Sequence, residues 1–297
     1  MNQPRNLHAS TSIQGVEIIM SPVQFDRENN EKLWIGTSWK MTKTLGEAQS
    51  YVRALLSEPL PNTLNVFVLP AHTALATVRA AVPDTSALLL GAQDAHWAPE
   101  GAATGEISMR MVADAGASIV EIGHSERREA FCETDDRVSR KVRAAIDYDL
   151  VPLICVGESR EVREAGEEVS FVAGQVERAL ARLTPSECTG SLFAYEPIWA
   201  IGQGGRPALA EEVAPVMAAM GSVLDRLSQG GVARALLYGG SVHVGNLREL
   251  LSVPMVDGVF VGRAAWDARE FRCLLRIAAE VCAEQKRGPI WGEARRD

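Results

Sequence analysis

From about residue 32 onward, the sequence alternates short, uninterrupted apolar runs with longer amphipathic stretches. Such a run is typical of a parallel strand buried on both faces, whereas the stretches between have the length and periodicity of helices. The apolar runs are LWIGTSW, LNVFVLP, ALLLGAQ, SIVEIG, VPLICVG, SLFAYEP, RALLYGG and VDGVFVG. The amphipathic stretches include Thr44–Leu56, Thr134–Tyr148, Val169–Leu183, Leu209–Leu227 and Ala264–Val281. This alternation is typical of two α/β folds, the closed (β/α)₈ barrel and the open doubly wound sheet.

The pattern favours the barrel, because no G-x-G-x-x-G sequence follows the first apolar run as it would in a dinucleotide-binding open sheet. Thr44 and Glu47 have the spacing of a capping box at the start of the first predicted helix. We expect the polar residues 1–31 to be a flexible leader, residues 32–284 to form one (β/α)₈ catalytic domain, and residues 285–297 to be a tail.

The composition excludes several classes of protein. A net charge of −8 argues against nucleic acid or an anionic membrane as partner, since both select basic surfaces. The five cysteines include no C-x-x-C pair and the five histidines are dispersed, so neither a disulfide framework nor a metal site is predicted. No run is long enough to span a membrane, and the N-terminal residues lack the apolar core of a signal peptide. We therefore expect a cytoplasmic protein.

The predicted strands end in polar or glycine-bearing segments. In a parallel barrel these ends meet at one rim, where barrel enzymes carry their catalytic groups. The segments are Ser38–Lys40, Gln93–Asp94, Gly123–His124, Gly157–Glu158, Glu196, Gly239–Ser241 and Gly262–Arg263.

Motifs at this rim resemble those of the triosephosphate isomerase family, in the family's order and spacing, over residues from about 32 to 280. They are SWKM (38–41), TGEIS (104–108), EIGHSERR (121–128), CVGE (155–158), AYEPIWAIG (194–202), LYGGSV (237–242) and DGVFVG (257–262). The resemblance implies a single barrel of eight parallel strands ringed by helices. It also implies an isomerase that needs no cofactor or metal and moves a carbonyl group by one carbon along a small phosphorylated sugar.

The resemblance assigns four catalytic side chains. Glu196, at the end of an apolar strand, is the base that removes a proton next to the carbonyl group. His124 precedes the sequence SERR, which is predicted to start a short helix; a neutral His124 polarises the carbonyl by donating a hydrogen bond. Lys40 stabilises the enediolate. Glu126 is either a proton-relay carboxylate or only an ion-pair partner of Arg127 or Lys40.

For the substrate phosphate, the resemblance implies backbone N–H donors at Gly202, Ser241, Gly262 and Arg263. It further implies a lid at Pro197–Pro207 that excludes water from the intermediate. The loop Thr104–Ser108 is similar to the one through which members of the family form a homodimer.

Three positions depart from the family pattern. Ser38 replaces an asparagine, Arg263 replaces the second glycine of a phosphate loop, and Gly205-Arg206-Pro207 replaces the usual Lys-Thr-Ala lid hinge. Pro207 has no N–H, so Tyr238 cannot latch a closed lid through that group.

These departures resemble the branch of the family that isomerises erythrulose phosphates. Its substrate, L-erythrulose 1-phosphate, is dihydroxyacetone phosphate with one additional hydroxymethyl group, and its product is D-erythrulose 4-phosphate. Replacement of asparagine by Ser38 would make room for that group. Two alternatives stay open: a triosephosphate isomerase proper, and a non-catalytic barrel used as a scaffold.

Overall fold

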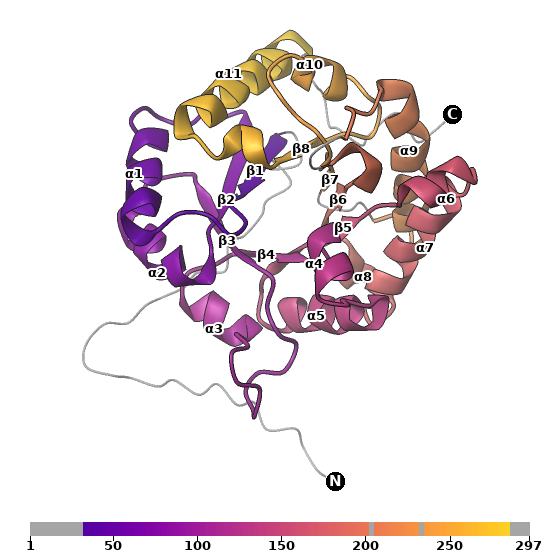
Figure 1. The fold of residues 1–297 in the computed structure, drawn as a ribbon, viewed down its shortest axis with the longest axis horizontal. Coiled ribbons are helices and arrows are strands. Elements are labelled where there is room, and N and C mark those ends of the chain that lie inside the picture. The colour runs from indigo at the N-terminus through magenta and orange to yellow at the C-terminus, as the bar shows by residue number, and fades with distance from the viewer. Residues whose placement is uncertain (1–31, 202–204, 232–234, 286–297) are drawn as a thin grey trace.

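The computed structural model describes residues 32–201, 205–231 and 235–285. Eight parallel strands form a closed barrel in which each strand pairs with the next and β8 pairs with β1 (Figure 1). The predicted (β/α)₈ barrel is thereby confirmed, whereas the predicted leader and residues 286–297 of the predicted tail lie outside the described residues. The strands are β1 Leu33–Ser38, β2 Leu64–Leu69, β3 Leu89–Gln93, β4 Ile119–Ile122, β5 Val151–Val156, β6 Leu192–Tyr195, β7 Ala235–Tyr238 and β8 Gly258–Val261.

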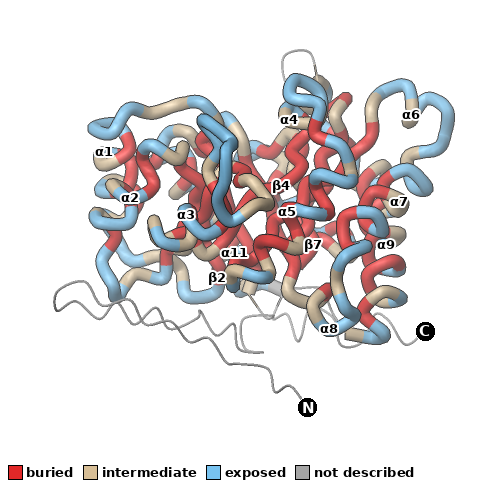
Figure 2. Tube along the Cα trace, turned by 90° about the horizontal axis from the view of Figure 1, so that it is seen from below, coloured by how far each residue is buried: buried red, intermediate tan, exposed pale blue. Residues whose placement is uncertain are grey.

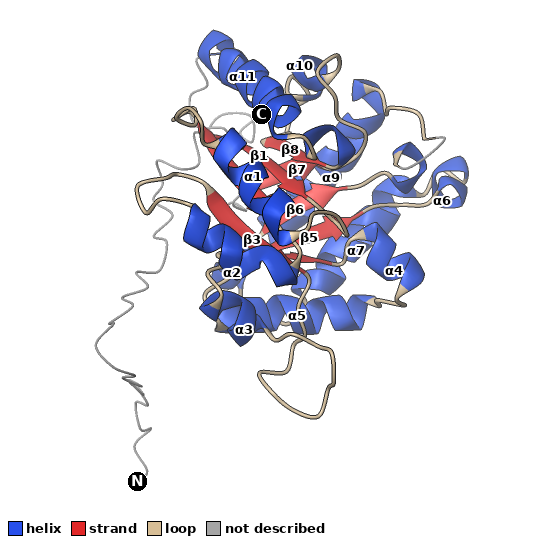
Figure 3. Cartoon of the chain, turned by 60° about the vertical axis from the view of Figure 1, so that its left-hand side comes forward, coloured by secondary structure: helices blue, strands red, loops and turns tan. Residues whose placement is uncertain are grey.

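Helices surround the barrel and cover the outer faces of its strands (Figures 1 and 3). They are α1 Leu45–Leu55, α2 His72–Ala81, α3 Met109–Asp114, α4 Ser125–Ala130, α5 Asp135–Asp147, α6 Arg160–Glu164, α7 Glu168–Leu180, α8 Pro185–Cys188, α9 Ala210–Leu227, α10 Leu247–Leu250 and α11 Ala268–Gln285. Two short 3₁₀ turns, η2 Ile198–Ala200 and η3 Arg263–Ala265, follow β6 and β8. No helix in this described part of the chain has the length and apolarity needed to cross a membrane.

The predicted helix Ala264–Val281 is wrong at its start. Residues 263–265 form the separate turn η3, and α11 begins only at Ala268. The side chain of Asp267 accepts hydrogen bonds from the backbone N–H groups of Arg269 and Glu270, at 2.8 and 3.2 Å. A cap of this kind satisfies the free donors of a helix start, so the chain begins a new helix there. Thr44 and Glu47 do form the predicted capping box at α1.

Two apolar layers hold the fold together. The outer layer lies between strands and helices, and the inner layer fills the barrel (Figure 2). Inside the barrel the rings of Phe67 and Phe260 stack with centroids 5.8 Å apart. Gly36 leaves room for them, since a Cβ atom there would lie 1.9 Å from the Phe67 ring. The filled interior leaves the C-terminal rim of the strands as the place for a polar site.

Candidate active site

Glu196 follows β6 directly and is 2% exposed. One oxygen, Oε1, lies 3.3 Å from Nε2 of His124, and the other, Oε2, accepts a hydrogen bond from the backbone N–H of Ser125 at 3.2 Å. Gly157 permits the close approach of β5 at this point, because a Cβ atom there would lie 1.8 Å from the carbonyl oxygen of Glu196. The carboxylate is therefore held at the rim, shielded from water and next to the imidazole.

His124 is the N-cap residue of α4, as the sequence predicted from the SERR segment. Its Nδ1 accepts a hydrogen bond from the backbone N–H of Glu126 at 3.1 Å. A nitrogen that accepts cannot carry a proton, so the ring is neutral with its proton on Nε2. That N–H is then available to a carbonyl oxygen bound beside Glu196.

Lys40 and Glu126 form an ion pair in which Nζ lies 2.7 Å from Oε1. Lys40 has a φ of 52°, a backbone conformation that costs a non-glycine residue on the order of 1 kcal/mol and that persists only where its surroundings enforce it. Burial alone would raise the pKa of the Glu126 carboxyl, but the hydrogen bond and charge of Lys40 outweigh burial and lower that pKa. Of the two partners that the sequence left open for Glu126, the structure therefore shows Lys40.

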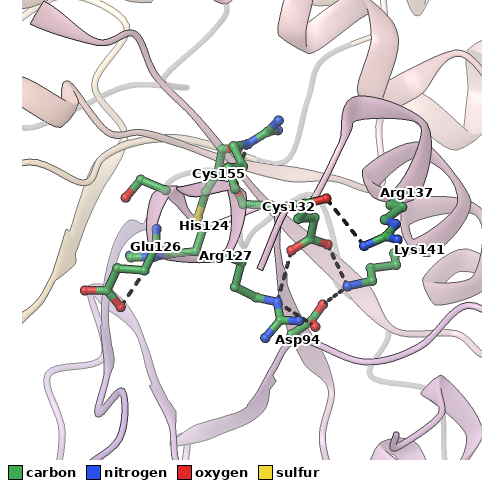
Figure 4. Close-up of polar contacts among 12 residues, drawn as sticks. Asp94, His124, Glu126, Arg127, Cys132, Arg137, Lys141 and Cys155 are labelled. Atoms are coloured by element: carbon green, nitrogen blue, oxygen red, sulfur yellow. Dashed lines mark hydrogen bonds and ion pairs between the residues drawn. The ribbon is translucent and has the colours of Figure 1, made fainter. Parts of the chain in front are cut away.

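Arg127 belongs to a cluster of charged side chains next to His124 and Glu126 (Figure 4). Its Nε lies 2.8 Å from Asp94 and 3.0 Å from Glu133, and the buried Lys141 contacts the same two carboxylates at 2.6 Å each. These contacts tie the end of β3 to α4 and α5. The cluster thus fixes the helix whose first turn orients His124.

Two cavities meet at these side chains. One, of about 410 Å³, lies beneath the ends of β6, β7 and β8 and is lined by residues that include Gly239–Ser241 and Gly262–Arg263. We call it the glycine lobe. The other, of about 370 Å³, lies towards β3 and β4 and includes Asp94, Glu106 and Glu121 among its lining residues. We call it the carboxylate lobe. Both lobes are lined by Ser38, Lys40, His124 and Glu126, whereas Glu196 lines the glycine lobe.

The predicted substrate-binding residues divide between these surfaces. Ser38 lines both lobes; Ser241, Gly262 and the exposed Arg263 line the glycine lobe. Gly202 lies outside the described residues. The glycine lobe combines strand-end glycines with the cation of Arg263, and a surface of this kind suits a phosphate group.

The described part of the predicted lid is anchored at Trp199. Its indole N–H donates to the buried carboxyl of Glu158 at 2.6 Å, and the guanidinium carbons of Arg163 and Arg206 lie 4.6 and 4.7 Å from the centroid of its ring. The hydroxyl of Tyr238 is buried, and the backbone of Ala208 and Ser241 lies next to it. Burial raises the pKa of Tyr238 to about 12. The expectation that this tyrosine does not latch the lid through Pro207 stays a prediction.

Sequence reasoning did not single out Glu121, which lies in β4 and is 5% exposed. It accepts a hydrogen bond from the hydroxyl of Ser38 at 2.9 Å. Its strand neighbour Ile119 packs inside the barrel, and the two-residue period of a strand turns Glu121 the same way. An acidic residue at an inward position of an otherwise apolar strand was the signal that could have identified it.

Glu121, Cys155 and Glu196 each place one donor atom within 4.8 Å of the others. Such a set could supply ligands to a metal ion. However, burial raises the pKa of the Cys155 thiol well above its usual value, and the two carboxylates raise it further. Both carboxyl groups of this set also have partners in the site described above, Glu196 beside His124 and Glu121 beside Ser38.

Comparison with known proteins agrees with this geometry. The family model for triosephosphate isomerase matches residues 33–278. The L-erythrulose-1-phosphate isomerase of Mycolicibacterium smegmatis is 47% identical over 253 residues, which cover 84% of this chain and 94% of that protein. Proteins of the same name from Brucella abortus and Rhizobium rhizogenes are 44% and 43% identical, over 85% and 86% of this chain and 99% and 97% of their own lengths. The chain therefore belongs to the triosephosphate isomerase family.

Proposed function

We propose that this protein isomerises L-erythrulose 1-phosphate to D-erythrulose 4-phosphate by proton transfer. The observation that carries the proposal is the meeting of a buried carboxylate, a neutral imidazole and an ammonium group at one cavity: Glu196, His124 and Lys40. The choice of a four-carbon substrate is supported by the names of the similar proteins and by Ser38, which occupies little volume where the two lobes meet.

In this mechanism the carboxylate of Glu196 takes the proton from C-3 of the substrate. The electron pair of that bond forms the double bond between C-2 and C-3, and negative charge develops on the oxygen at C-2. The Nε2–H of His124 and the ammonium of Lys40 stabilise that charge. Glu196 then returns a proton to C-2, and the proton of the C-3 hydroxyl passes to the oxygen at C-2. The carbonyl group has moved by one carbon, with no net change of oxidation state.

The phosphate binds in the glycine lobe, on backbone N–H groups at Ser241, Gly262 and Arg263 and, by resemblance, at Gly202. A protein with a net charge of −8 needs such a local site for an anionic substrate. Glu126 keeps Lys40 in place between the two lobes. Pro197–Pro207 acts as the lid.

The protein functions as a homodimer in the cytoplasm. The loop containing Thr104–Ser108 projects from the barrel next to α3 (Figures 1 and 3). Met41 and Phe131, which are 98% and 61% exposed, line the outer part of the carboxylate lobe and offer apolar surface to a second subunit. Ser38 and Glu121, which are 3% and 5% exposed, line the buried part of this lobe, which stays free for substrate. All five cysteines are free, which suits a reducing compartment. Sedimentation should give twice the mass of 32.1 kDa, and a monomer at working concentration would contradict this part of the proposal.

The experiment is turnover of L-erythrulose 1-phosphate in D₂O, followed by NMR after exhaustive chelation with EDTA. The proposal predicts formation of D-erythrulose 4-phosphate with deuterium at its C-3. This carbon is C-2 in the numbering of the substrate, to which Glu196 returns a proton. Loss of activity in EDTA that a divalent ion restores would contradict the metal-free mechanism. Turnover of dihydroxyacetone phosphate but of no tetrulose phosphate would identify a triosephosphate isomerase proper, and turnover of neither would favour a scaffold.

A further inference from the structure

The mechanism above gives no task to the buried carboxyl of Glu121. Glu121 reaches the cavity from β4, and its hydrogen-bond partner is the hydroxyl of Ser38. An apolar side chain at this inward position would extend the barrel's apolar layer and avoid the cost of burying a carboxyl group. The carboxyl is also close to a second one, since a Glu121 oxygen and a Glu196 oxygen lie within 4.8 Å. A costly arrangement of this kind points to a ligand that it recognises.

The position of Glu121 relative to the lobes indicates which part of a ligand it would contact. The phosphate group is expected in the glycine lobe, and the reacting carbons are expected between His124, Lys40 and Glu196. In L-erythrulose 1-phosphate the terminal hydroxymethyl group, C-4, is the end of the chain most distant from the phosphate. It must therefore point away from the glycine lobe, and the space that continues past Ser38 is the carboxylate lobe with Glu121.

We propose that Glu121, held by Ser38, is the specificity-determining residue that hydrogen-bonds the C-4 hydroxyl of the four-carbon substrate. This inference rests on the proposed function. It explains why a small hydroxyl residue at position 38 and an acidic residue at position 121 occur together. Ser38 leaves space for the hydroxymethyl group, and its hydroxyl orients the Glu121 carboxyl that binds this group.

The state of the carboxyl suits this task. Burial raises the pKa of Glu121 above its usual value, and the nearby Glu196 carboxylate adds to that effect. His124, the hydrogen bond from Ser38 and the positive charge of Lys40 act in the opposite direction without reversing it. In either protonation state the carboxyl has acceptor capacity beyond the hydrogen bond from Ser38, and in its protonated form it can also donate. It can thus accept from Ser38 and hydrogen-bond a substrate hydroxyl at the same time.

A different role must be separated from this one. Because Glu121 and Glu196 are neighbours, Glu121 could act only through the base, by changing its proton affinity. A residue that acts in this way affects every substrate that loses a proton to Glu196. A residue that hydrogen-bonds the C-4 hydroxyl affects kcat/KM only for substrates that carry this hydroxyl.

The test compares three substrates: L-erythrulose 1-phosphate, its 4-deoxy analogue with a methyl group at C-4, and dihydroxyacetone phosphate. Wild type should prefer the first over the 4-deoxy analogue by about 10- to 100-fold in kcat/KM, the expected cost of leaving a buried polar group unpaired. Glu121→Leu should abolish this preference and leave kcat/KM for the other two substrates within about threefold. Glu121→Gln, which keeps a donor and an acceptor, should retain most of the preference.

Glu158→Gln is a matched control, because Glu158 is also a buried carboxyl at the rim with a raised pKa but lines neither lobe. Any decrease in kcat/KM that Glu158→Gln causes should be equal for all three substrates.

A wild type that turns over the hydroxy and deoxy tetrulose phosphates equally well overturns the proposal, even if Glu121→Leu fails to fold. An equal loss for all three substrates in Glu121→Leu overturns it in favour of a role through Glu196. Failure of wild type on both tetrulose phosphates, with dihydroxyacetone phosphate turned over, would instead overturn the proposed function and this inference with it.

Discussion

The two lobes of the cavity offer opposite chemistry although they share four residues. The glycine lobe presents strand-end glycines and the cation of Arg263, whereas the carboxylate lobe presents Asp94, Glu106 and Glu121. Asp94 is paired with Lys141 and Arg127, so its charge is largely balanced within the protein. A phosphate group is therefore placed in the glycine lobe by what that lobe offers, its strand-end glycines and Arg263, and not by repulsion from the other lobe. The polyol end of the substrate then faces the hydrogen-bonding carboxyl groups of the carboxylate lobe.

The largest effect on kcat is expected at Glu196, the proposed base. Glu196→Gln removes the base and should lower kcat by about 10²–10⁴-fold. Glu196→Asp keeps the charge but retracts it by about 1 Å, which can cost about 10²-fold. Steady-state kinetics measure both. Near-wild-type kcat in either variant would move the base to another residue, with Glu121 the first candidate because of its proximity.

The next effect is expected at His124, one of the four residues that line both lobes. His124→Gln removes the Nε2–H donor and should lower kcat by about 10²–10³-fold, with a much smaller change in KM, because the hydrogen bond matters most as charge develops. Separate determination of kcat and KM tests this. A change confined to KM would show that the histidine only binds the ground state.

A smaller effect should appear where the lobes meet. Ser38→Asn adds volume and removes the hydroxyl that holds Glu121, so kcat/KM for L-erythrulose 1-phosphate should fall by about 10- to 100-fold. The fall for dihydroxyacetone phosphate should be less than this. Ser38→Ala is the control that removes the hydroxyl without adding volume. Equal losses for both substrates in Ser38→Asn would argue against a role of this position in substrate choice.

The smallest effect concerns stability. The pKa of Glu121 in the folded protein is raised above its usual value of 4.5. Below pH 4.5 the carboxyl is protonated in both the folded and the unfolded protein, so its ionisation does not affect the free energy of unfolding. As the pH rises from 4.5 through the folded-state pKa, the carboxyl ionises first in the unfolded chain, and the free energy of unfolding falls. Glu121→Gln should therefore increase the free energy of unfolding more at pH 8 than at pH 4.5.

Urea unfolding of wild type and variant at both pH values measures the difference, and the comparison at each pH cancels the other titrating groups to first order. The groups that face Glu121 are Ser38, Lys40, His124, Cys155 and Glu196. A variant equally stabilised or destabilised at both pH values would show that Glu121 ionises as freely in the native state as in the unfolded chain.

Strand burial and helix periodicity are local signals, so the sequence favoured the barrel and located its rim, and the resemblance of the rim motifs to the triosephosphate isomerase family identified the fold. The start of α4 at Ser125 was predictable for the same reason. The contact between Ser38 and Glu121 was not, because it joins β1 to β4 and depends on how far each strand reaches towards the rim. The choice of Lys40 as partner of Glu126 likewise depends on the backbone turn at Lys40. Local patterns thus located the residues, and only the closed barrel showed which ones touch.

The central claim is that the carboxylate lobe accommodates the polyol end of a four-carbon substrate. Its most direct test is competition: purified wild-type protein receives L-erythrulose 1-phosphate and dihydroxyacetone phosphate together, and both products are followed in time. Such an experiment gives the ratio of the two kcat/KM values directly. The account predicts a ratio of about 10–10³ in favour of L-erythrulose 1-phosphate. A ratio of one or below would contradict it and would identify a triosephosphate isomerase proper.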